Sequence, residues 1–195
     1  MNSFDPIFKE IRKYITLNHE TVHLIIPHLK RKKYLKNEVL LHLGERSDKI
    51  FFIVKGVIRE FFINRNGDDL TTQIVAESNF FYSTVSYHSG QPSYRIVEAL
   101  EDCEAICIEK HNFIALVNQI PELLHLNLQI LEHTLLNFEQ RSELWKIRPA
   151  SLRLEMFLLK YPFLANRVSK KYIASFLNIN PSTFSRIKFL KPGHL

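Results

Sequence analysis

Residues 169–191 read SKKYIASFLNINPSTFSRIKFLK, two short amphipathic segments separated by a turn. Ser169 is a good N-cap for the first segment. Asn180 caps the second, with Pro181 at the first helical position, where a missing N–H costs nothing. Ile179 lies in the turn and can fill the space between two helices. The inward-facing residues are apolar: Ile173, Phe176, Leu177, Phe184, Ile187 and Leu190. This pattern predicts a helix-turn-helix.

The outward-facing residues of this segment have the chemistry of a DNA-reading surface. A recognition helix approaches base edges with its N-terminal residues, while basic side chains beside it hold phosphates. The Arg186 guanidinium can pair with guanine O6 and N7, and Ser182 and Thr183 carry short donors and acceptors. The alternative is a small helical hairpin with a basic surface. We expect DNA contacts from Ser169, Lys170, Lys171, Asn180, Ser182, Thr183, Ser185, Arg186, Lys188 and Lys191.

The excess of positive over negative charge lies entirely at this end of the chain. The net charge is +6, and residues 156–195 contain no Asp or Glu. Seven of the 26 Lys and Arg residues lie there, which leaves 19 basic against 20 acidic residues in the remainder. A one-sided basic segment indicates a polyanionic partner. The helical spacing of its apolar residues argues against an unfolded basic tail.

A long helical stretch, residues 121–148, precedes this segment. Apolar residues recur along it at alternating intervals of four and three, interrupted by Ser142. Such a narrow seam is typical of a coiled coil, so we expect a parallel homodimer. The alternative is a helix that packs on its own domain. Pro149 ends the stretch. The predicted dimer seam consists of Leu124, Leu128, Leu131, Leu135, Phe138 and Trp145.

Residues 34–109 contain short β-branched and aromatic runs between turn signals such as Asn66-Gly67. This spacing predicts a small sandwich or a jelly-roll β-barrel, of which we expect the barrel, with flanking helices at residues 4–29. The fold class is therefore α+β. We expect a sensor domain at residues 1–120, a dimerisation helix at 121–148 and a helix-turn-helix domain at 149–195.

The chain resembles the cAMP receptor protein/FNR family of bacterial transcription regulators, particularly its short members without a C-terminal wing. Residues 53–69, IVKGVIREFFINRNGDD, resemble the family's cyclic nucleotide-binding barrel, and YIASFLNINPSTFSRIK at 172–188 resembles its DNA-binding signature. The resemblance runs from about residue 20 to 191. It implies a homodimer that binds a near-palindromic operator and contacts RNA polymerase. We therefore expect a sequence-specific transcription regulator.

The resemblance also identifies candidate effector residues, and they argue against cAMP. Family members that bind cAMP place a glutamate and an arginine in a phosphate cassette, here aligned with residues 78–99. Arg95 is nearby, but alternation along a strand would point it away from Tyr94. Without a cation the phosphate loses its charge-assisted hydrogen bonds. No cofactor is therefore expected, although an unknown small-molecule effector stays open. The effector candidates are Ser83, Ser93 and Tyr94 in the cassette and Phe138 and Glu139 at the adenine positions.

Other sequence features suggest different functions, but each is incomplete. His19-Glu20-Thr21-Val22-His23 spells HExxH, a zinc-protease motif, but no third ligand or cleft is evident, so neither an enzyme nor a metal site is expected. A cupin-like metal enzyme needs paired histidines on its strands, whereas this chain has only His42 and His88 on or beside its expected strands and no HxH pair. A cyclic nucleotide- or small-ligand-binding module is a further alternative. The run Lys30–Lys33 suits a solvated loop, or else a contact with DNA or polymerase.

The predicted cellular setting is the cytoplasm. The first residues, MNSFDPIFKE, carry an early acid and no apolar core of a signal peptide, and no stretch is apolar enough to span a bilayer. The two cysteines, Cys103 and Cys107, are four apart in an alternating run, too distant for a disulfide along one strand. We expect them to be structural, and the missing N-terminal cysteines argue against an iron–sulfur cluster of the FNR type.

Overall fold

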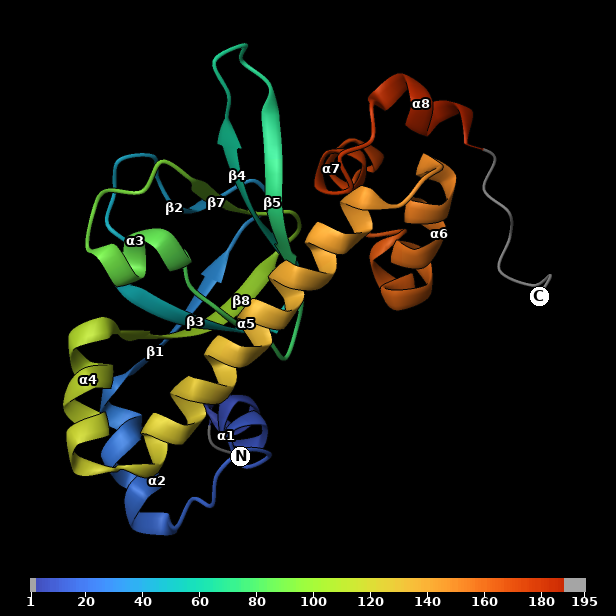
Figure 1. Cartoon of the computed structure of the whole chain (residues 1–195). Helices are drawn as coiled ribbons and strands as arrows, with labels where there is room; N and C mark the ends of the chain where they lie inside the picture. The colour runs from blue at the N-terminus through green and yellow to red at the C-terminus, as the bar shows by residue number, and fades with distance from the viewer. Residues whose placement is uncertain (1–2, 188–195) are drawn as a thin grey trace.

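Two antiparallel four-stranded sheets dominate the N-terminal half of the chain (Figure 1). The structure, a computed structural model, describes residues 3–187. The sheets have the strand orders β1-β8-β3-β6 and β2-β7-β4-β5. Their strands are β1 (Leu29–Tyr34), β2 (Val39–Leu41), β3 (Lys49–Lys55), β4 (Ile58–Ile63), β5 (Asp69–Val75), β6 (Phe80–Phe81), β7 (Ile96–Ala99) and β8 (Cys103–Glu109).

The α+β class with an N-terminal β-sandwich is confirmed, but the predicted barrel is wrong. Among the described residues no strand pairing joins one sheet to the other, so each sheet keeps two edges. Closure needs continuous pairing around the sheet, and the outer strands β2 and β6 have only three and two residues. The run Lys30–Lys33, expected in a loop, lies in β1 at a sheet edge. Exposed charges suit that position because they discourage pairing with another chain.

Alternation along β3 and β8 produces two apolar layers. Phe51 and Ile53 face the space between the sheets, with Cys103 and Cys107 from β8. Both thiols are free, and burial raises the pKa of Cys103 to about 11. Neighbouring residues of β3 face the other way, onto a layer of helices. A two-residue period therefore supplies both cores from one strand.

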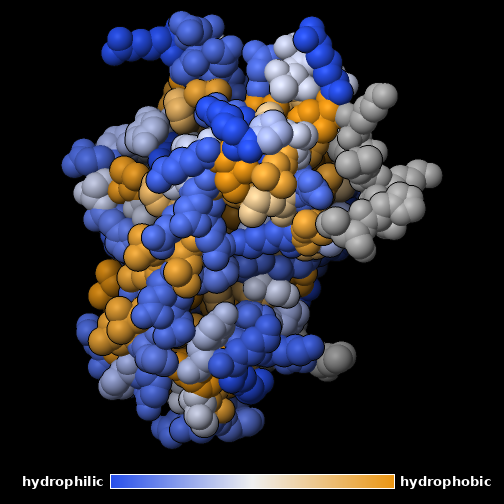
Figure 2. Space-filling model, turned by 45° about the vertical axis from the view of Figure 1, so that its right-hand side comes forward, coloured by the Kyte–Doolittle hydropathy of each residue, from blue (hydrophilic) through white to orange (hydrophobic). Residues whose placement is uncertain are grey.

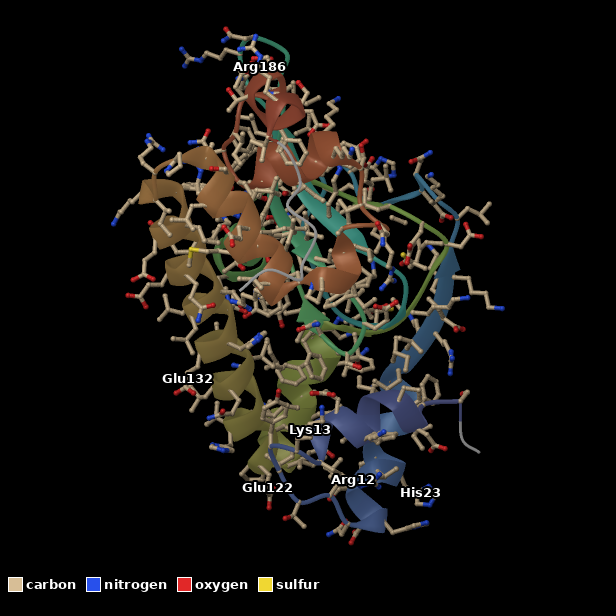
Figure 3. All side chains as sticks on the ribbon, turned by 90° about the vertical axis from the view of Figure 1, so that its right-hand side faces the viewer. Arg12, Lys13, His23, Glu122, Glu132 and Arg186 are labelled. Carbon is tan, nitrogen blue, oxygen red and sulfur yellow. The ribbon has the colours of Figure 1, made fainter. Side chains whose placement is uncertain are left out.

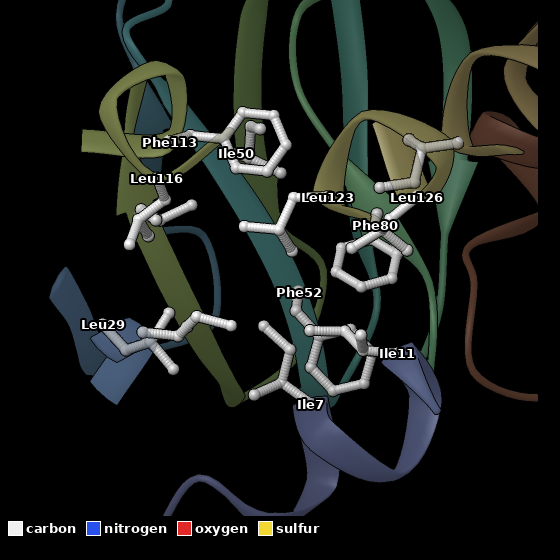
Figure 4. A pocket seen from close by; sticks show the side chains of 13 residues that line it. Ile7, Ile11, Leu29, Ile50, Phe52, Phe80, Phe113, Leu116, Leu123 and Leu126 are labelled. Carbon is white, nitrogen blue, oxygen red and sulfur yellow. The ribbon is translucent and has the colours of Figure 1, made fainter. Parts of the chain in front are cut away.

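The helical layer covers one sheet and includes the first half of the long helix α5 (Glu122–Lys146). Leu123, Leu126 and Ile130 of α5 are buried there. An apolar pocket lies between these helices and the sheet, and Ile7 and Phe113 are among its lining residues (Figure 4). No helix within residues 3–187 combines the length and apolar character that a bilayer span requires. The other helices of this layer are α1 (Asp5–Ile11), α2 (His19–Ile25), η1 (Ile26–His28) and α4 (Lys110–Gln119).

A smaller helical part follows α5 and has its own core. Leu154, Phe157, Leu177 and Phe184 are buried in it. Val57, Ala76 and Leu100 of the sandwich join the same cluster, so the two parts share apolar surface. The helices here are α6 (Ala150–Lys160), η2 (Pro162–Leu164), α7 (Lys170–Phe176) and α8 (Pro181–Arg186), while α3 (Thr84–Ser89) belongs to the sandwich.

The turn between β3 and β4 requires glycine. Gly56 has a φ of +96°, and a Cβ there would lie 2.8 Å from the Cα of Cys103 and 2.9 Å from the carbonyl oxygen of Asp102. Gly67, in the β4–β5 turn, has a similar φ of +83° but nothing within 4 Å of a Cβ. The two turns therefore share a backbone requirement and differ in available space.

Gly56→Ala should destabilise the protein more than Gly67→Ala. The left-handed backbone alone costs about 1–2 kcal/mol with a side chain, and overpacking against the β8 backbone adds about 1–3 kcal/mol at position 56. Urea unfolding followed by circular dichroism measures both losses. Equal losses for the two variants would contradict the close approach of Gly56 to β8.

Candidate functional site

The helix-turn-helix segment forms two short helices, α7 and α8, around a buried turn. Asn178 adopts a φ of +52°, which turns the chain sharply and places Ile179 in the core. Asn180 caps α8: its Oδ1 accepts hydrogen bonds from the Ser182 backbone N–H at 2.9 Å and the Ser182 hydroxyl at 2.7 Å. Ser169 occupies the N-cap position of α7, but its side chain makes no capping hydrogen bond.

The candidate DNA contacts within residues 3–187 are all exposed. Arg186 lies at the opposite end of the molecule from the N-terminal helices that carry Arg12 and His23 (Figure 3). Thr183 and Ser185 are exposed on the same short helix. Lys188 and Lys191 lie outside the described residues. The exposed candidates are Ser169, Lys170, Lys171, Asn180, Ser182, Thr183, Ser185 and Arg186.

Helix α7 packs directly on β5 of the sandwich. The Ser175 hydroxyl accepts a hydrogen bond from the Thr71 N–H at 2.8 Å and donates to the Asp69 carbonyl at 3.1 Å. The ring of Tyr172 lies 3.6 Å from the guanidinium of Arg59 in β4, which is 2% exposed. The first helix of the pair is thus held on the sandwich, a contact that the sequence pattern did not predict.

Arg167, just before α7, adds an ionic contact between the two parts. Its Nη1 donates to Glu77 at 3.0 Å, and its Nη2 donates to both Glu77 and Glu101. Burial raises the pKa of the Glu77 carboxyl, but hydrogen bonds from Arg167 and backbone amides outweigh it, and the net shift is downward. We call the contacts of Arg167, Tyr172 and Ser175 with the sandwich the clamp.

Helix α5 presents a second apolar face to solvent. Leu124 is 52% exposed, Leu128 49%, Leu135 65% and Phe138 63%. Figure 2 shows orange apolar side chains interrupting the hydrophilic surface of the molecule. Leu131 is half-buried.

The last residue of the predicted seam has a partner within its own chain. Trp145 is half-buried, and its Nε1 donates to the Phe176 carbonyl of α7 at 3.0 Å. The heptad pattern assigned this residue to the seam, while the structure also gives it a place at the junction of α5 and α7.

The candidate effector residues are only partly brought together. Ser83 is 2% exposed, and its hydroxyl donates to the Glu60 carboxylate at 2.6 Å. Ser93 is buried too, but its hydroxyl bonds the backbone of Arg95. Tyr94 is 51% exposed. Phe138 and Glu139 are both exposed on α5.

Glu60 and Arg95, two charged residues that the sequence pattern did not assign to the site, meet beside Ser83. Arg95 Nη1 donates to Glu60 Oε2 at 2.6 Å, and Glu60 is completely buried. The charges of Arg95 and Glu60 also act on Arg141 of α5, where burial, then Arg95, lowers the pKa to about 10. Arg95 precedes β7 rather than lying in it, so the expected strand alternation did not apply. The sequence signal that could have identified this cluster is Glu60 itself, an acidic residue directly before Phe61 and Phe62 in β4.

The HExxH residues lie on α2 and do not gather further ligands. The rings of His19 and His23 have centroids 4.5 Å apart, and both residues are exposed with Glu20. Within residues 3–187 no group of three His, Cys, Asp or Glu side chains is arranged to hold a metal ion.

Comparison with known proteins identifies the sandwich. Residues 31–120 match the cyclic nucleotide-binding domain family. The chain is 23% identical over 111 residues to the cAMP-activated global transcriptional regulator CRP of Pasteurella multocida, covering 56% of this chain and 53% of that protein. It is 22% identical over 141 residues to the cyclic AMP receptor protein of Thermus thermophilus, covering 72% and 65%. The chain thus spans about half the length of the first relative.

Solved structures share the arrangement. FixK2 from Bradyrhizobium japonicum superposes with a TM-score of 0.72 at 17% identity over 82% of each chain. The c-di-GMP responsive regulator CLP of Xanthomonas campestris gives 0.68 at 14% identity over 87% of this chain and 89% of that one. At these identities the likeness shows the fold. With the sequence matches, it confirms the predicted resemblance to Crp/Fnr-type regulators.

A cyclic nucleotide does not fit the cluster of Glu60, Ser83 and Arg95 as it stands. Its phosphate requires a cation and hydroxyl donors. The guanidinium of Arg95 and the hydroxyl of Ser83 already serve the carboxylate of Glu60, each at 2.6 Å. An incoming phosphate would meet that carboxylate.

The ion pair of Arg167 with Glu77 in the clamp should make the free energy of unfolding depend on pH. Because the folded pKa of Glu77 lies below its ordinary value of 4.5, its stabilising effect is present above pH 4.5 and is lost as pH falls through the lowered pKa. Glu77→Gln should therefore lower the free energy of unfolding at pH 7 and converge with wild type in acid. Urea unfolding monitored by Trp145 fluorescence measures this, with Glu139→Gln as an exposed control. A gap that stays constant down to pH 3 would contradict the ion pair.

Proposed function

We propose that this Crp/Fnr-type chain, whose residues 31–120 form a cyclic nucleotide-binding domain, is a homodimeric transcription regulator that binds specific DNA sequences. The observation that carries the proposal is the exposed α8 helix at one end of the molecule. It presents Thr183, Ser185 and Arg186 within a segment, residues 156–195, that has no acidic residue. The likeness to regulators such as FixK2 and CLP supports it.

The exposed residues divide by the kind of contact that they offer. Arg186 at the C-terminal end of α8 suits bidentate pairing with guanine. Lys170 and Lys171 begin α7 and suit phosphate, which adds affinity without sequence choice. Asn180 and Ser182 are joined in the α8 cap, so they also set the angle at which the helix starts.

The dimer is proposed from the two faces of α5. One face, with Leu123, Leu126 and Ile130, is buried on the sandwich of its own chain. The other exposes leucines that recur at heptad spacing, and pairing with a second α5 would cover them. Two copies related by a two-fold axis would present two α8 helices to two half-sites of DNA.

The remaining partners rest on family likeness. Contact with RNA polymerase and a place in the cytoplasm follow from what the resemblance implies, and no catalytic residue is assigned. The cyclic nucleotide-binding domain supports a small-molecule effector as a class. The curated relatives carry cAMP in their names, but the pocket of this chain argues against that ligand.

Arg186→Ala should relax base selection, whereas Lys171→Ala should weaken all sequences alike. We expect the first to cost about 1–3 kcal/mol on the preferred site and the second to reduce the salt slope by about one. Selection of bound genomic fragments, then fluorescence anisotropy on the selected site at several salt concentrations, measures both. Unchanged selectivity in Arg186→Ala, or binding by wild type without sequence preference, would refute the assignment.

Leu135→Glu should convert the dimer to a monomer, because a charge would be buried in the seam without a partner. Leu159→Glu is the matched control: Leu159 is 67% exposed on α6, close to the 65% of Leu135, but lies outside the seam. Sedimentation velocity at micromolar concentration measures the mass of each variant. Dimers of both variants would show that α5 is not the interface.

A further inference from the structure

The carboxylate of Glu60 is held by donors from three different segments. Ser83, at the start of α3, donates to Oε1 at 2.6 Å. Thr72 of β5 donates to Oε2 at 2.8 Å, Arg95 donates to the same oxygen at 2.6 Å, and Gln73 approaches it at 3.4 Å. Two hydroxyls and a guanidinium around one anion are also the donor types that bind a phosphate or carboxylate ligand.

The charges around Glu60 are unequal. The buried Glu60 carboxylate is paired with the Arg95 guanidinium, and the charges of both act on Arg141 of α5. The Nε of Arg95 and that of Arg141 are buried without a hydrogen-bond partner among the described residues. Without Glu60, the Arg95 guanidinium, whose side chain is 21% exposed, would lose its carboxylate partner while the positive charge of Arg141 stayed nearby. Burying unpaired charge is expensive, so this site needs an anion.

We propose that Glu60 is an internal ligand: its carboxylate occupies the place of the anionic group that this type of domain would take from solution, so the pocket is filled by the chain itself. The native protein then has no free anion site between Arg95, Ser83 and Thr72. Removing the side chain opens a site for a small carboxylate or phosphate.

This proposal concerns the sandwich and does not require that the protein bind DNA. It also identifies side chains near Glu60 that can report on a substitution there. Arg59, next to Glu60 on β4, contacts Tyr172 of α7, and the Arg141 guanidinium lies 4.5 Å from the ring centroid of Trp145. Trp145, the single tryptophan, thus lies beside a side chain on which the charge of Glu60 acts, and its fluorescence can be compared between wild type and the Glu60 variants without any activity assay.

The test compares Glu60→Ala with Glu60→Gln and wild type. Alanine leaves space and excess positive charge, so propionate, acetate or inorganic phosphate should bind and stabilise it. Glutamine removes the charge but fills the space, so these anions should have no site. We expect the Tm of Glu60→Ala to rise by roughly 3–6 °C at an anion concentration ten times its Kd, measured against chloride at equal ionic strength. Wild type and Glu60→Gln should respond only as they do to chloride.

Two results would overturn the proposal. One is equal stabilisation of Glu60→Ala and Glu60→Gln by these anions. The other is binding of cAMP, cGMP or phosphate to wild type in calorimetry, because the pocket would then be open in the native protein. The wild-type titration decides the matter even if Glu60→Ala does not fold.

Discussion

Two adjacent buried charges on β4 constrain this structure more than any other feature. Arg59 is 2% exposed and Glu60 is fully buried, and successive residues of a strand face opposite sides. Each therefore needs its own partners, because burying an unpaired charge is strongly unfavourable. Arg59 has Asp69 and Glu98 at 2.5 and 2.7 Å, and Glu60 has Arg95. One short strand thereby organises both sides of its sheet.

The two sides have different consequences for function. On the outer side, Arg59 supports Tyr172, so α7 rests on the sandwich and fixes where α8 points. On the inner side, Glu60 draws together β5, α3 and the segment before β7. The helix-turn-helix and the pocket are thus connected through neighbouring backbone positions. A change in the contacts of Glu60 and a change in the contacts of α7 would therefore act on adjacent residues of the same strand.

Sequence patterns predicted the features that depend on the spacing of nearby residues. They did not predict the contacts between segments that are far apart in the chain. The Asn180 cap and the apolar positions of residues 169–187 were predicted because a helix start is encoded within a few residues, whereas the predicted side-chain cap of Ser169 does not form. The heptad seam described one face of α5 but not the face buried on the sandwich. Arg95 was expected to point away from Tyr94, because strand alternation was applied to a residue outside any strand; instead its Nη2 donates to the Tyr94 hydroxyl at 3.2 Å. The barrel was expected because short strands predict closure as readily as a sandwich.

The amino-acid sequence by itself determined the α+β class, the helix-turn-helix, the long helix with an exposed leucine seam and the confinement of the excess positive charge to one end. These follow from residue type and period, which are local properties. Only the tertiary structure decided that α7 docks on β5, that Trp145 contacts α7 and that Glu60 meets Arg95. These partners are up to about a hundred residues apart, as Thr71 and Ser175 are, and no local period encodes which buried charges will meet.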